Sequence, residues 1–359
     1  MQHNSTSMPS INRRTFIGGA VALATNPLAS QANGYQAKDW HAKNWQEVAN
    51  KARALEQCHA IVIYQNGYQV LAERFRGPAL DRLIPVKSVS KTLVAALTGI
   101  AVDWGEIPSM QSTLGELIPE LIPRNADPKV AEITIDNLVT MRAGLERTSG
   151  PGYNRWIDSS NWVASALSRP MVEEPGTVML YSTGSYHVLG AILSKITGTS
   201  LLTLARYRLG RPLDIEIPAW TRDPQGRYLG GNEMAMTITA MIRFGEMYRN
   251  GGLVGKKRVL SEDWVSKSQQ QVTRSIFSGL GYGYGWFLGE TTGTSYALAR
   301  GYGGQIICFV PDLSLTFAIT SDPSLPAPTH GYFGDLLRLI KYSIIPAARS
   351  NATFTTAAQ

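Results

Sequence analysis

The first regular pattern along the chain is a helical segment followed by two strands. Apolar residues recur at helical spacing between Lys38 and Gln57. His59–Tyr64 and Tyr68–Phe75 then have the composition of strands, with Asn66–Gly67 between them. A tight turn between antiparallel strands needs positive φ angles, which Asn and Gly accept, so this stretch predicts a β-hairpin.

Strand-like runs return only near the end of the chain. They are Ser295–Arg300, Gln305–Val310 and Leu313–Thr320, and they are separated by a glycine-rich turn and by Pro311–Asp312. Apolar residues at helical spacing then predict a closing amphipathic helix over Tyr332–Ile345.

The middle of the chain has the spacing of helices joined by loops. A continuous apolar run after Ser88 predicts a buried helix that ends near Gly105. Further helices are predicted over 133–141, 185–195 and 237–248. Strands at both ends with helices between them predict an α+β fold. One antiparallel sheet would be built from the N- and C-terminal strands and flanked by helices, with an inserted, mostly helical lobe.

The N-terminus has the features of a targeting segment. Asn12-Arg-Arg-Thr-Phe16 joins paired arginines to an apolar run that is too short to span a bilayer. Ser30–Ala32 then supplies small residues for cleavage. This order is typical of a twin-arginine export signal. We therefore expect a periplasmic or secreted protein with no transmembrane segment after the signal is removed.

These patterns divide the chain into three parts. The signal peptide is expected over 1–32, one folded domain over 33–346 and a disordered tail over 347–359. Within the domain, the α/β lobe takes about 38–87 and 254–346, and the helical lobe takes about 88–253.

Composition excludes several classes of protein. The 359 residues are 44% hydrophobic and 17% charged, as in ordinary soluble globular proteins, and the net charge is +7. No basic run is interleaved with aromatic residues, so no nucleic acid partner is expected. Cys58 and Cys308 are too few for a disulfide framework or a four-ligand zinc site, and their apolar surroundings predict buried, free thiols. The five histidines are scattered, and no metal or cofactor is expected.

Ser88-Val-Ser-Lys91 opens the buried helix and carries the clearest chemical signal. Residues three apart share one face of a helical turn. A serine at a helix start lies near free N–H groups that stabilise negative charge, and a lysine in an apolar wall shifts toward its neutral form. An activated serine nucleophile needs this arrangement. The alternative interpretation is an N-capping serine beside an exposed lysine.

Two later stretches add candidate groups. Tyr181 precedes a predicted helix start, and a phenol held partly ionised by a nearby ammonium can act as a general base. Its alternative is a core tyrosine with a satisfied hydroxyl. Gly301-Tyr-Gly-Gly-Gln305 enters an apolar strand, and its glycines would leave main-chain N–H groups free to hold an oxyanion. Its alternative is a simple glycine-rich turn.

Together, Ser88-x-x-Lys91, Tyr181-Ser-Thr and Gly301–Gln305 resemble the three motifs of the serine β-lactamase and penicillin-recognising superfamily. The similarity is greatest to its class C, esterase-like branch, which includes 6-aminohexanoate-oligomer hydrolases. It covers about residues 45–345. It implies a β-lactamase/transpeptidase-like fold, which agrees with the strand–helix–strand order of the chain.

The resemblance also implies roles for the motif residues. Ser88 would be the nucleophile that accepts the acyl group, and Lys91 would hold or relay its proton. Tyr181 would serve as a base and later protonate the leaving group. The main-chain N–H groups of Ser88 and Gln305 would form the oxyanion hole. Lys91 and Tyr181 would titrate as a coupled pair, and either could be the first base.

The chain departs from the β-lactamases of the family at two motifs. Thr183 stands where they have the asparagine of Tyr-x-Asn, and Tyr302-Gly303-Gly304 stands where they have Lys-Thr-Gly. The first change removes an amide that contacts a β-lactam side chain, and the second removes the cation that pairs with its carboxylate. We expect Thr183, Tyr302, Gly303 and Gly304 to line a site for substrates without that carboxylate. Lys195-Ile-Thr-Gly198 is instead predicted to end a helix.

The sequence therefore predicts an exported serine hydrolase that cleaves a small carboxylic ester or linear amide through an acyl-enzyme on Ser88. Three alternatives remain: a penicillin-binding-like protein that only binds a cell-wall peptide, a D-alanyl-D-alanine peptidase and a weak β-lactamase. Binding alone would need none of the three reactive side chains. The missing lysine of Lys-Thr-Gly counts against the other two alternatives.

Overall fold

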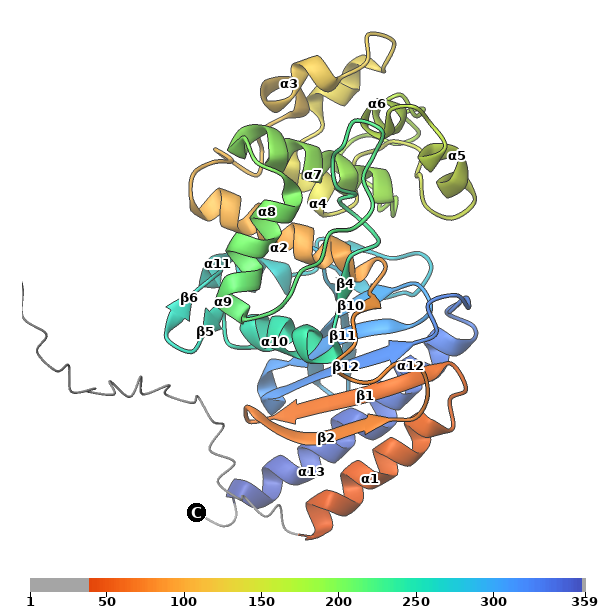
Figure 1. The fold of residues 1–359 in the computed structure, drawn as a ribbon, viewed down its shortest axis with the longest axis vertical. Coiled ribbons are helices and arrows are strands. Elements are labelled where there is room, and N and C mark those ends of the chain that lie inside the picture. The colour runs from red at the N-terminus through yellow and green to blue at the C-terminus, as the bar shows by residue number, and fades with distance from the viewer. Residues whose placement is uncertain (1–38, 357–359) are drawn as a thin grey trace, which may run out of the picture.

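One antiparallel sheet runs through the molecule and has helices on both of its faces (Figure 1). The structure is a computed structural model that describes residues 39–356. The architecture is the α+β fold that the sequence predicts, with a mostly helical lobe beyond one face of the sheet. The predicted signal segment 1–32 lies outside the described residues.

The sheet brings together strands from the two ends of the sequence. In the described residues it has eight strands in the order β2-β1-β12-β11-β10-β9-β8-β7, and every neighbouring pair is antiparallel. Two short pairings, β3 with β4 and β5 with β6, lie outside it. The strands are β1 (Cys58–Gln65), β2 (Tyr68–Arg74), β3 (Ile84–Pro85), β4 (Ala235–Met236), β5 (Leu253–Val254), β6 (Lys257–Arg258), β7 (Thr273–Arg274), β8 (Gly281–Tyr282), β9 (Phe287–Thr291), β10 (Thr294–Gly301), β11 (Gln305–Val310) and β12 (Leu315–Ser321).

The α-helices include both long core helices and single turns. They are α1 (Asp39–Arg53), α2 (Val89–Asp103), α3 (Leu114–Leu117), α4 (Ile135–Val139), α5 (Tyr153–Ile157), α6 (Trp162–Leu167), α7 (Thr183–Thr197), α8 (Leu201–Ala205), α9 (Arg211–Leu213), α10 (Ile238–Arg249), α11 (Glu262–Ser268), α12 (Tyr332–Leu339) and α13 (Ile345–Thr356). Two π-helical turns, 206–210 and 340–344, continue α8 into α9 and α12 into α13.

The predicted β-hairpin forms with the predicted turn. Asn66 and Gly67 have φ angles of 54° and 79°, as a tight turn between antiparallel strands requires. The hairpin places β1 beside β12, with Ile61 opposite Ile319. Because helices cover both faces at this point, β1 is buried almost throughout.

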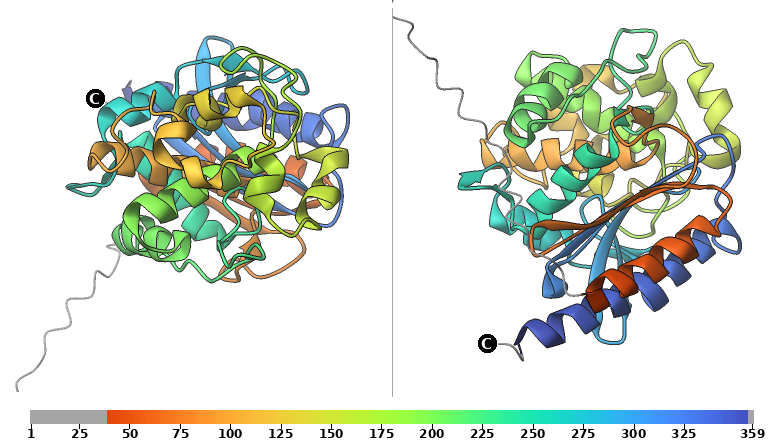
Figure 2. Two further views of the ribbon diagram at one scale, coloured as in Figure 1. Left: turned by 90° about the horizontal axis from the view of Figure 1, so that it is seen from above. Right: turned by 60° about the horizontal axis from the view of Figure 1, so that its bottom comes forward.

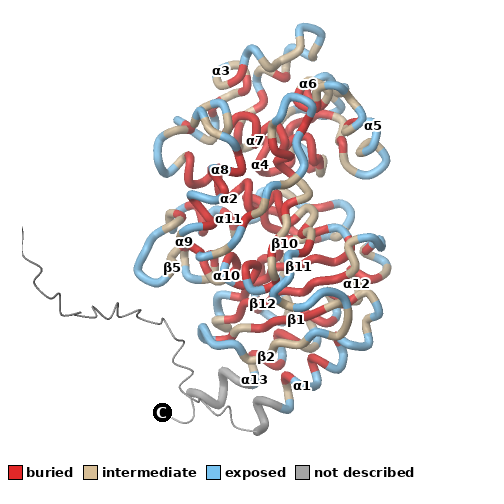
Figure 3. The backbone as a smooth tube through the Cα atoms, viewed as in Figure 1, coloured by how far each residue is buried: buried red, intermediate tan, exposed pale blue. Residues whose placement is uncertain are grey.

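Helices α1, α12 and α13 cover one face of the sheet, and α2 and α10 pack on the other (Figures 1 and 2). The core lies between these layers, so buried positions follow the central strands and α2 from Val89 to Ala101 (Figure 3). An aromatic cluster joins α10 to the sheet through contacts between the rings of Phe244, Tyr248, Trp286 and Phe309.

Helix α10 packs on the sheet, although it falls within the range of about 88–253 that is expected for the helical lobe. It packs against β11 and β12, and Gly245 makes the close approach possible. A Cβ atom there would lie 2.7 Å from Thr316 Cγ2 and 2.9 Å from Ile307 Cγ2. Helix α10 is therefore attached to the sheet, although it lies within the range expected for the helical lobe.

Two further features differ from the expectations. The strands β7, β8 and β9 were not predicted, because they are short and rich in glycine or polar residues. At the C-terminus, α13 runs to Thr356, although a disordered tail was expected from residue 347. Ala348 is fully buried there, and Gln65 Nε2 donates a hydrogen bond to its carbonyl oxygen at 2.9 Å, so tertiary contacts hold the helix.

Both cysteines are free and fully buried, Cys58 on β1 and Cys308 on β11, as predicted. Between residues 39 and 356, no single helix has the length and hydropathy to cross a membrane. Only α7 taken together with Leu201–Leu213 passes that test, and the two are bent by 85°.

Candidate active site

Ser88 lies at the start of α2, directly after a residue with an uncommon, positive φ angle. Lys87 has a φ angle of 52°, in the left-handed region, whereas Ser88 is already helical at −68°. The segment before the serine is held by main-chain contacts, since Val86 N donates to Met234 O at 2.9 Å and β3 pairs with β4. Ser88 is thus presented, partly exposed, by a rigid turn.

Lys91 is 2% exposed and points its ammonium group at three oxygen atoms. Its Nζ lies 2.9 Å from Ser88 Oγ, 3.1 Å from Thr183 Oγ1 and 2.7 Å from Gly231 O. Desolvation by burial lowers the pKa of Lys91 from 10.5 to about 7. A lysine with such a pKa is neutral in a large fraction of molecules near neutral pH and can then take the proton of Ser88.

Tyr181 immediately precedes the N-cap of α7 and lies beside Lys91. Lys91 Nζ is 5.0 Å from the centre of its ring, and the ring stacks on Phe287 at 6.0 Å. Burial raises the pKa of Tyr181, although a hydrogen bond with Ser88 and the charge of Arg300 act in the opposite direction. The raised pKa favours a neutral phenol over the expected partly ionised one, and the role of Tyr181 as base or acid stays a prediction.

The glycine-rich turn begins beside the segment that leads to Ser88. Strand β10 ends at Gly301, and a Cβ atom there would lie 2.2 Å from the carbonyl oxygen of Val86. Only glycine permits this approach between β10 and the segment that leads to Ser88. The side chain of Tyr302, the next residue, is 52% exposed.

The rest of the turn packs away from Val86. Gly303 lies against the carbonyl of Asp322, and Gly304 lies against the ring of Tyr332. The side chain of Gln305 is fully buried and forms hydrogen bonds with the main chain of Ser321, at 2.7 Å from Nε2 and 3.1 Å to Oε1. The Gln305 side chain is thus occupied by Ser321, and the oxyanion role of the Gln305 main-chain N–H stays a prediction.

A family model described as Beta-lactamase matches residues 52–334. The chain belongs to the β-lactamase family. Penicillin-binding protein 4 of Amycolatopsis lactamdurans is 24% identical over 301 residues, which cover 72% of this chain and 76% of that protein. The 6-aminohexanoate-dimer hydrolase of Paenarthrobacter ureafaciens is 26% identical over 227 residues, which cover 59% of this chain and 57% of that enzyme.

A solved structure shares the fold of this β-lactamase family member. EstCE1, described as a hydrolase with promiscuous acyltransferase activity, has a TM-score of 0.68 at 17% identity, over 87% of this chain and 98% of its own. The similarity confirms the predicted β-lactamase-like architecture. With hydrolases among its relatives, the chain is a β-lactamase-fold enzyme, and serine hydrolase is its expected class.

Sequence reasoning missed Arg300. The motif comparison considers a cation only at position 302. The positive charge that acts to lower the pKa of Tyr181 is instead that of Arg300, two residues earlier on β10. The Arg300 guanidinium donates to Ala327 O at 2.6 Å and lies 3.5 Å from the ring centre of Phe333. Burial lowers its pKa to about 10. Because β10 ends at Gly301 and residue 302 lies in the turn that follows, no sequence pattern links these two positions, and the effect of Arg300 on Tyr181 arises only in the folded chain.

Ser149 was missed as well. Its Oγ lies 2.9 Å from both Thr183 N and Thr183 Oγ1, so it contacts directly the threonine that is hydrogen-bonded to Lys91. It lies in the loop after α4, and no motif marks it. The contact spans 34 residues and exists only in the folded chain.

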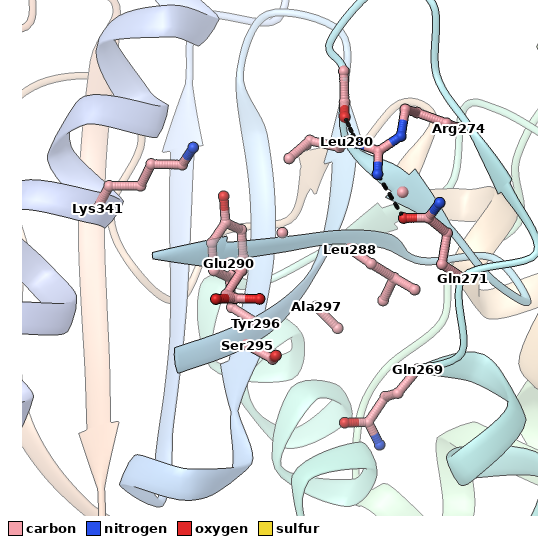
Figure 4. A pocket seen from close by; sticks show the side chains of 13 residues that line it. Gln269, Gln271, Arg274, Leu280, Leu288, Glu290, Ser295, Tyr296, Ala297 and Lys341 are labelled. Atoms are coloured by element: carbon pink, nitrogen blue, oxygen red, sulfur yellow. Dashed lines mark hydrogen bonds between the residues drawn. The ribbon is translucent and has the colours of Figure 1, made fainter. Parts of the chain in front are cut away.

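A separate cavity of about 460 Å³ lies at the edge of the sheet (Figure 4). Residues of β8, β9 and β10 line it together with Lys341, and none of Ser88, Lys91 and Tyr181 does. In the part of the chain that the structure describes, no group of His, Cys, Asp or Glu is suited to hold a metal ion.

Proposed function

We propose that this protein is an exported serine hydrolase that cleaves a carboxylic ester or a linear amide through an acyl-enzyme on Ser88. The observation that carries the proposal is the 2.9 Å contact between Ser88 Oγ and Lys91 Nζ, together with the Lys91 pKa of about 7. A buried lysine is energetically unfavourable, and its position against a serine hydroxyl fits a proton acceptor.

In the proposed first step, Ser88 Oγ attacks the substrate carbonyl while its proton passes to Lys91 Nζ. The carbonyl oxygen gains a negative charge, which the main-chain N–H groups of Ser88 and Gln305 would stabilise. Because Gly301 contacts Val86, the N–H of Tyr302 is a second candidate for the donor from this turn. Tyr181 then protonates the leaving group as the C–O or C–N bond breaks. Water releases the acyl group by the reverse proton transfers.

The substrate class follows from the two motif changes. Thr183 offers a hydroxyl where an amide would contact a β-lactam, and Tyr302 supplies no cation for its carboxylate. Two comparisons support acyl transfer without a β-lactam: one relative is named as a 6-aminohexanoate-dimer hydrolase, and EstCE1 is described as a hydrolase with acyltransferase activity. A dimer of 6-aminohexanoate is joined by a linear amide, so both esters and linear amides fit the proposal.

Labelling with a fluorophosphonate probe tests the nucleophile. We expect the wild-type protein to be labelled at Ser88, the Ser88→Ala variant to stay unlabelled, and Lys91→Ala to react at least about 100-fold more slowly because the base is lost. Ser165→Ala, a change of a partly exposed serine on α6, is the matched control. An unlabelled wild-type protein, or a labelled Ser88→Ala variant, would rule the mechanism out.

A second candidate function is supported by the similarity to penicillin-binding protein 4, which favours a cell-wall peptide as the substrate or ligand. A panel of p-nitrophenyl esters, linear amides, D-alanyl-D-alanine peptides and a chromogenic cephalosporin ranks the classes by kcat/KM. If the peptide or the cephalosporin had the highest kcat/KM, the assignment to esters and linear amides would be wrong.

Export remains part of the proposal and rests on residues 1–32 alone. Expression of the full chain in a bacterium, followed by fractionation, should place the protein in the periplasm. The double substitution Arg13→Lys and Arg14→Lys should retain it in the cytoplasm. Equal distribution of the two proteins would contradict a twin-arginine signal.

A further inference from the structure

A path of hydrogen bonds leads from the nucleophile to a second serine. Ser88 Oγ contacts Lys91 Nζ at 2.9 Å, Lys91 Nζ contacts Thr183 Oγ1 at 3.1 Å, and Thr183 Oγ1 contacts Ser149 Oγ at 2.9 Å. The two middle residues are 2% and 3% exposed. Ser88 and Ser149 are partly exposed, so the path is accessible to substrate at its two ends.

Counting protons assigns the direction of each bond once Lys91 is charged. An ammonium has three protons and no lone pair, so Lys91 donates to Ser88 Oγ, Thr183 Oγ1 and Gly231 O. The hydroxyl proton of Thr183 then has only Ser149 Oγ to bind. Thr183 N also donates to Ser149 Oγ, at 2.9 Å. Both lone pairs of the Ser149 hydroxyl are therefore occupied, and its own proton remains free.

We propose that Ser149 is a substrate-recognition residue whose hydroxyl donates a hydrogen bond to an acceptor oxygen in the acyl part of the substrate. The inference rests on the proposed function, because Lys91 becomes charged when it takes the proton of Ser88. From that step until the proton leaves, Ser149 can donate but cannot accept. An asparagine amide in place of Thr183 would offer both a donor and an acceptor, whereas this pair of hydroxyls offers a donor alone.

This assignment narrows the substrate class. Acyl chains that carry a second carbonyl or an ether oxygen beyond the scissile carbonyl would bind the free proton of Ser149. Plain alkyl chains would offer no hydrogen-bond acceptor to the Ser149 hydroxyl. Chains that place an N–H group beside Ser149 would oppose one donor to another, which is unfavourable. An intramolecular hydrogen bond of this kind contributes about 0.5–1.5 kcal/mol, which corresponds to a rate difference of about 2- to 10-fold.

Paired p-nitrophenyl esters test the assignment. The hexanoate is compared with its 3-oxo, 4-oxo and 5-oxo forms on the wild-type protein, Ser149→Ala, Ser149→Thr and the control Ser165→Ala. The measured quantity is the ratio of kcat/KM between each oxo ester and the alkyl ester. Dividing the variant's ratio by the wild-type ratio removes the intrinsic reactivity of each ester.

We expect Ser149→Ala to lower this ratio about 2- to 10-fold for at least one oxo ester, and Ser149→Thr, which has a hydroxyl, to keep the wild-type ratio. Ser165→Ala should leave the ratio unchanged. Equal losses on oxo and alkyl esters would mean that Ser149 only supports Thr183, and no loss would mean that it has no role; either result overturns the inference. If Ser88 is labelled by the fluorophosphonate in these cases, the proposed function stands. An unlabelled Ser88 with no ester turnover overturns both.

Discussion

Burial sets the protonation states of two residues beside Ser88 in ways that suit opposite roles. Desolvation lowers the pKa of Lys91 to about 7 and raises the pKa of Tyr181 above its ordinary value. The charge of Arg300 moderates the second effect. In the proposed mechanism the neutral amine accepts a proton and the neutral phenol donates one, so environment as well as residue type separates the base from the acid.

The pH dependence of kcat/KM should report the pKa of Lys91. The active form is the neutral amine, so the rate should fall about tenfold for each pH unit below a midpoint near 7 and level off above it. Lys91→Arg should abolish turnover, because a guanidinium stays charged. Lys195→Arg, at the end of the same helix that carries Thr183, should keep the wild-type profile. A profile without an inflection near 7 would contradict the base assignment.

The site lies where the ends of three elements meet. Helix α2 begins after Ser88, α7 begins after Ser182, and β10 ends at Gly301. The segment 230–236 holds the start of α2 in place, since Gly231 O accepts from Lys91 and Met234 O accepts from Val86 N. Small shifts of any of these ends would change the distances around Ser88.

Gly301→Ala tests how closely β10 must approach the segment that leads to Ser88. Its Cβ would lie 2.2 Å from Val86 O, so the strand end or the turn before Ser88 must move. We expect fluorophosphonate labelling to slow at least about tenfold and the free energy of unfolding to fall by about 1–3 kcal/mol.

Gly293→Ala, at the other end of β10, is the control for this substitution. Its added Cβ meets nothing within 4 Å, but its φ angle of 73° is unfavourable for alanine. The control should lose about 1 kcal/mol of stability and keep the wild-type labelling rate. Wild-type labelling of Gly301→Ala would show that the contact with Val86 is not needed for reactivity.

The whole molecule depends on pairing between the two ends of the chain. Strand β1 pairs with β12, and α1 and α13 pack together on the outer face of the sheet (Figure 2). The helical lobe is inserted between these ends. Loss of the sheet therefore requires separation of segments more than 250 residues apart, and we expect the sheet to unfold as one unit.

The two thiols test this cooperativity. Both are fully buried, and burial raises the pKa of Cys58 to about 12 and that of Cys308 well above its ordinary value. The folded protein should not react with Ellman's reagent, and the denatured protein should release two equivalents. At intermediate denaturant both thiols should react at one rate, that of global unfolding. Two separate rates would show that β1 opens independently of β11.

Patterns that depend on near neighbours were predictable from the sequence. Asn66–Gly67 predicts the hairpin because these two residue types accept the positive φ angles that a tight turn requires. Ser88 and Lys91 share a face because three positions make almost one helical turn. The strands over 295–320 are long enough to show their apolar character. The short strands β7, β8 and β9 are not, and they become strands only by pairing with β10 and each other.

Contacts between distant residues were decided only by the tertiary structure. Three sets of contacts join different elements. They are the hydrogen bonds of Lys91 with Thr183 and Gly231, the hydrogen bond between Thr183 and Ser149, and the effect of the Arg300 charge on the pKa of Tyr181. Sequence alone determined which reactive side chains the protein carries and on which elements they lie. Folding determined their protonation states and partners, because desolvation and hydrogen bonding depend on which distant groups the packed chain brings against them.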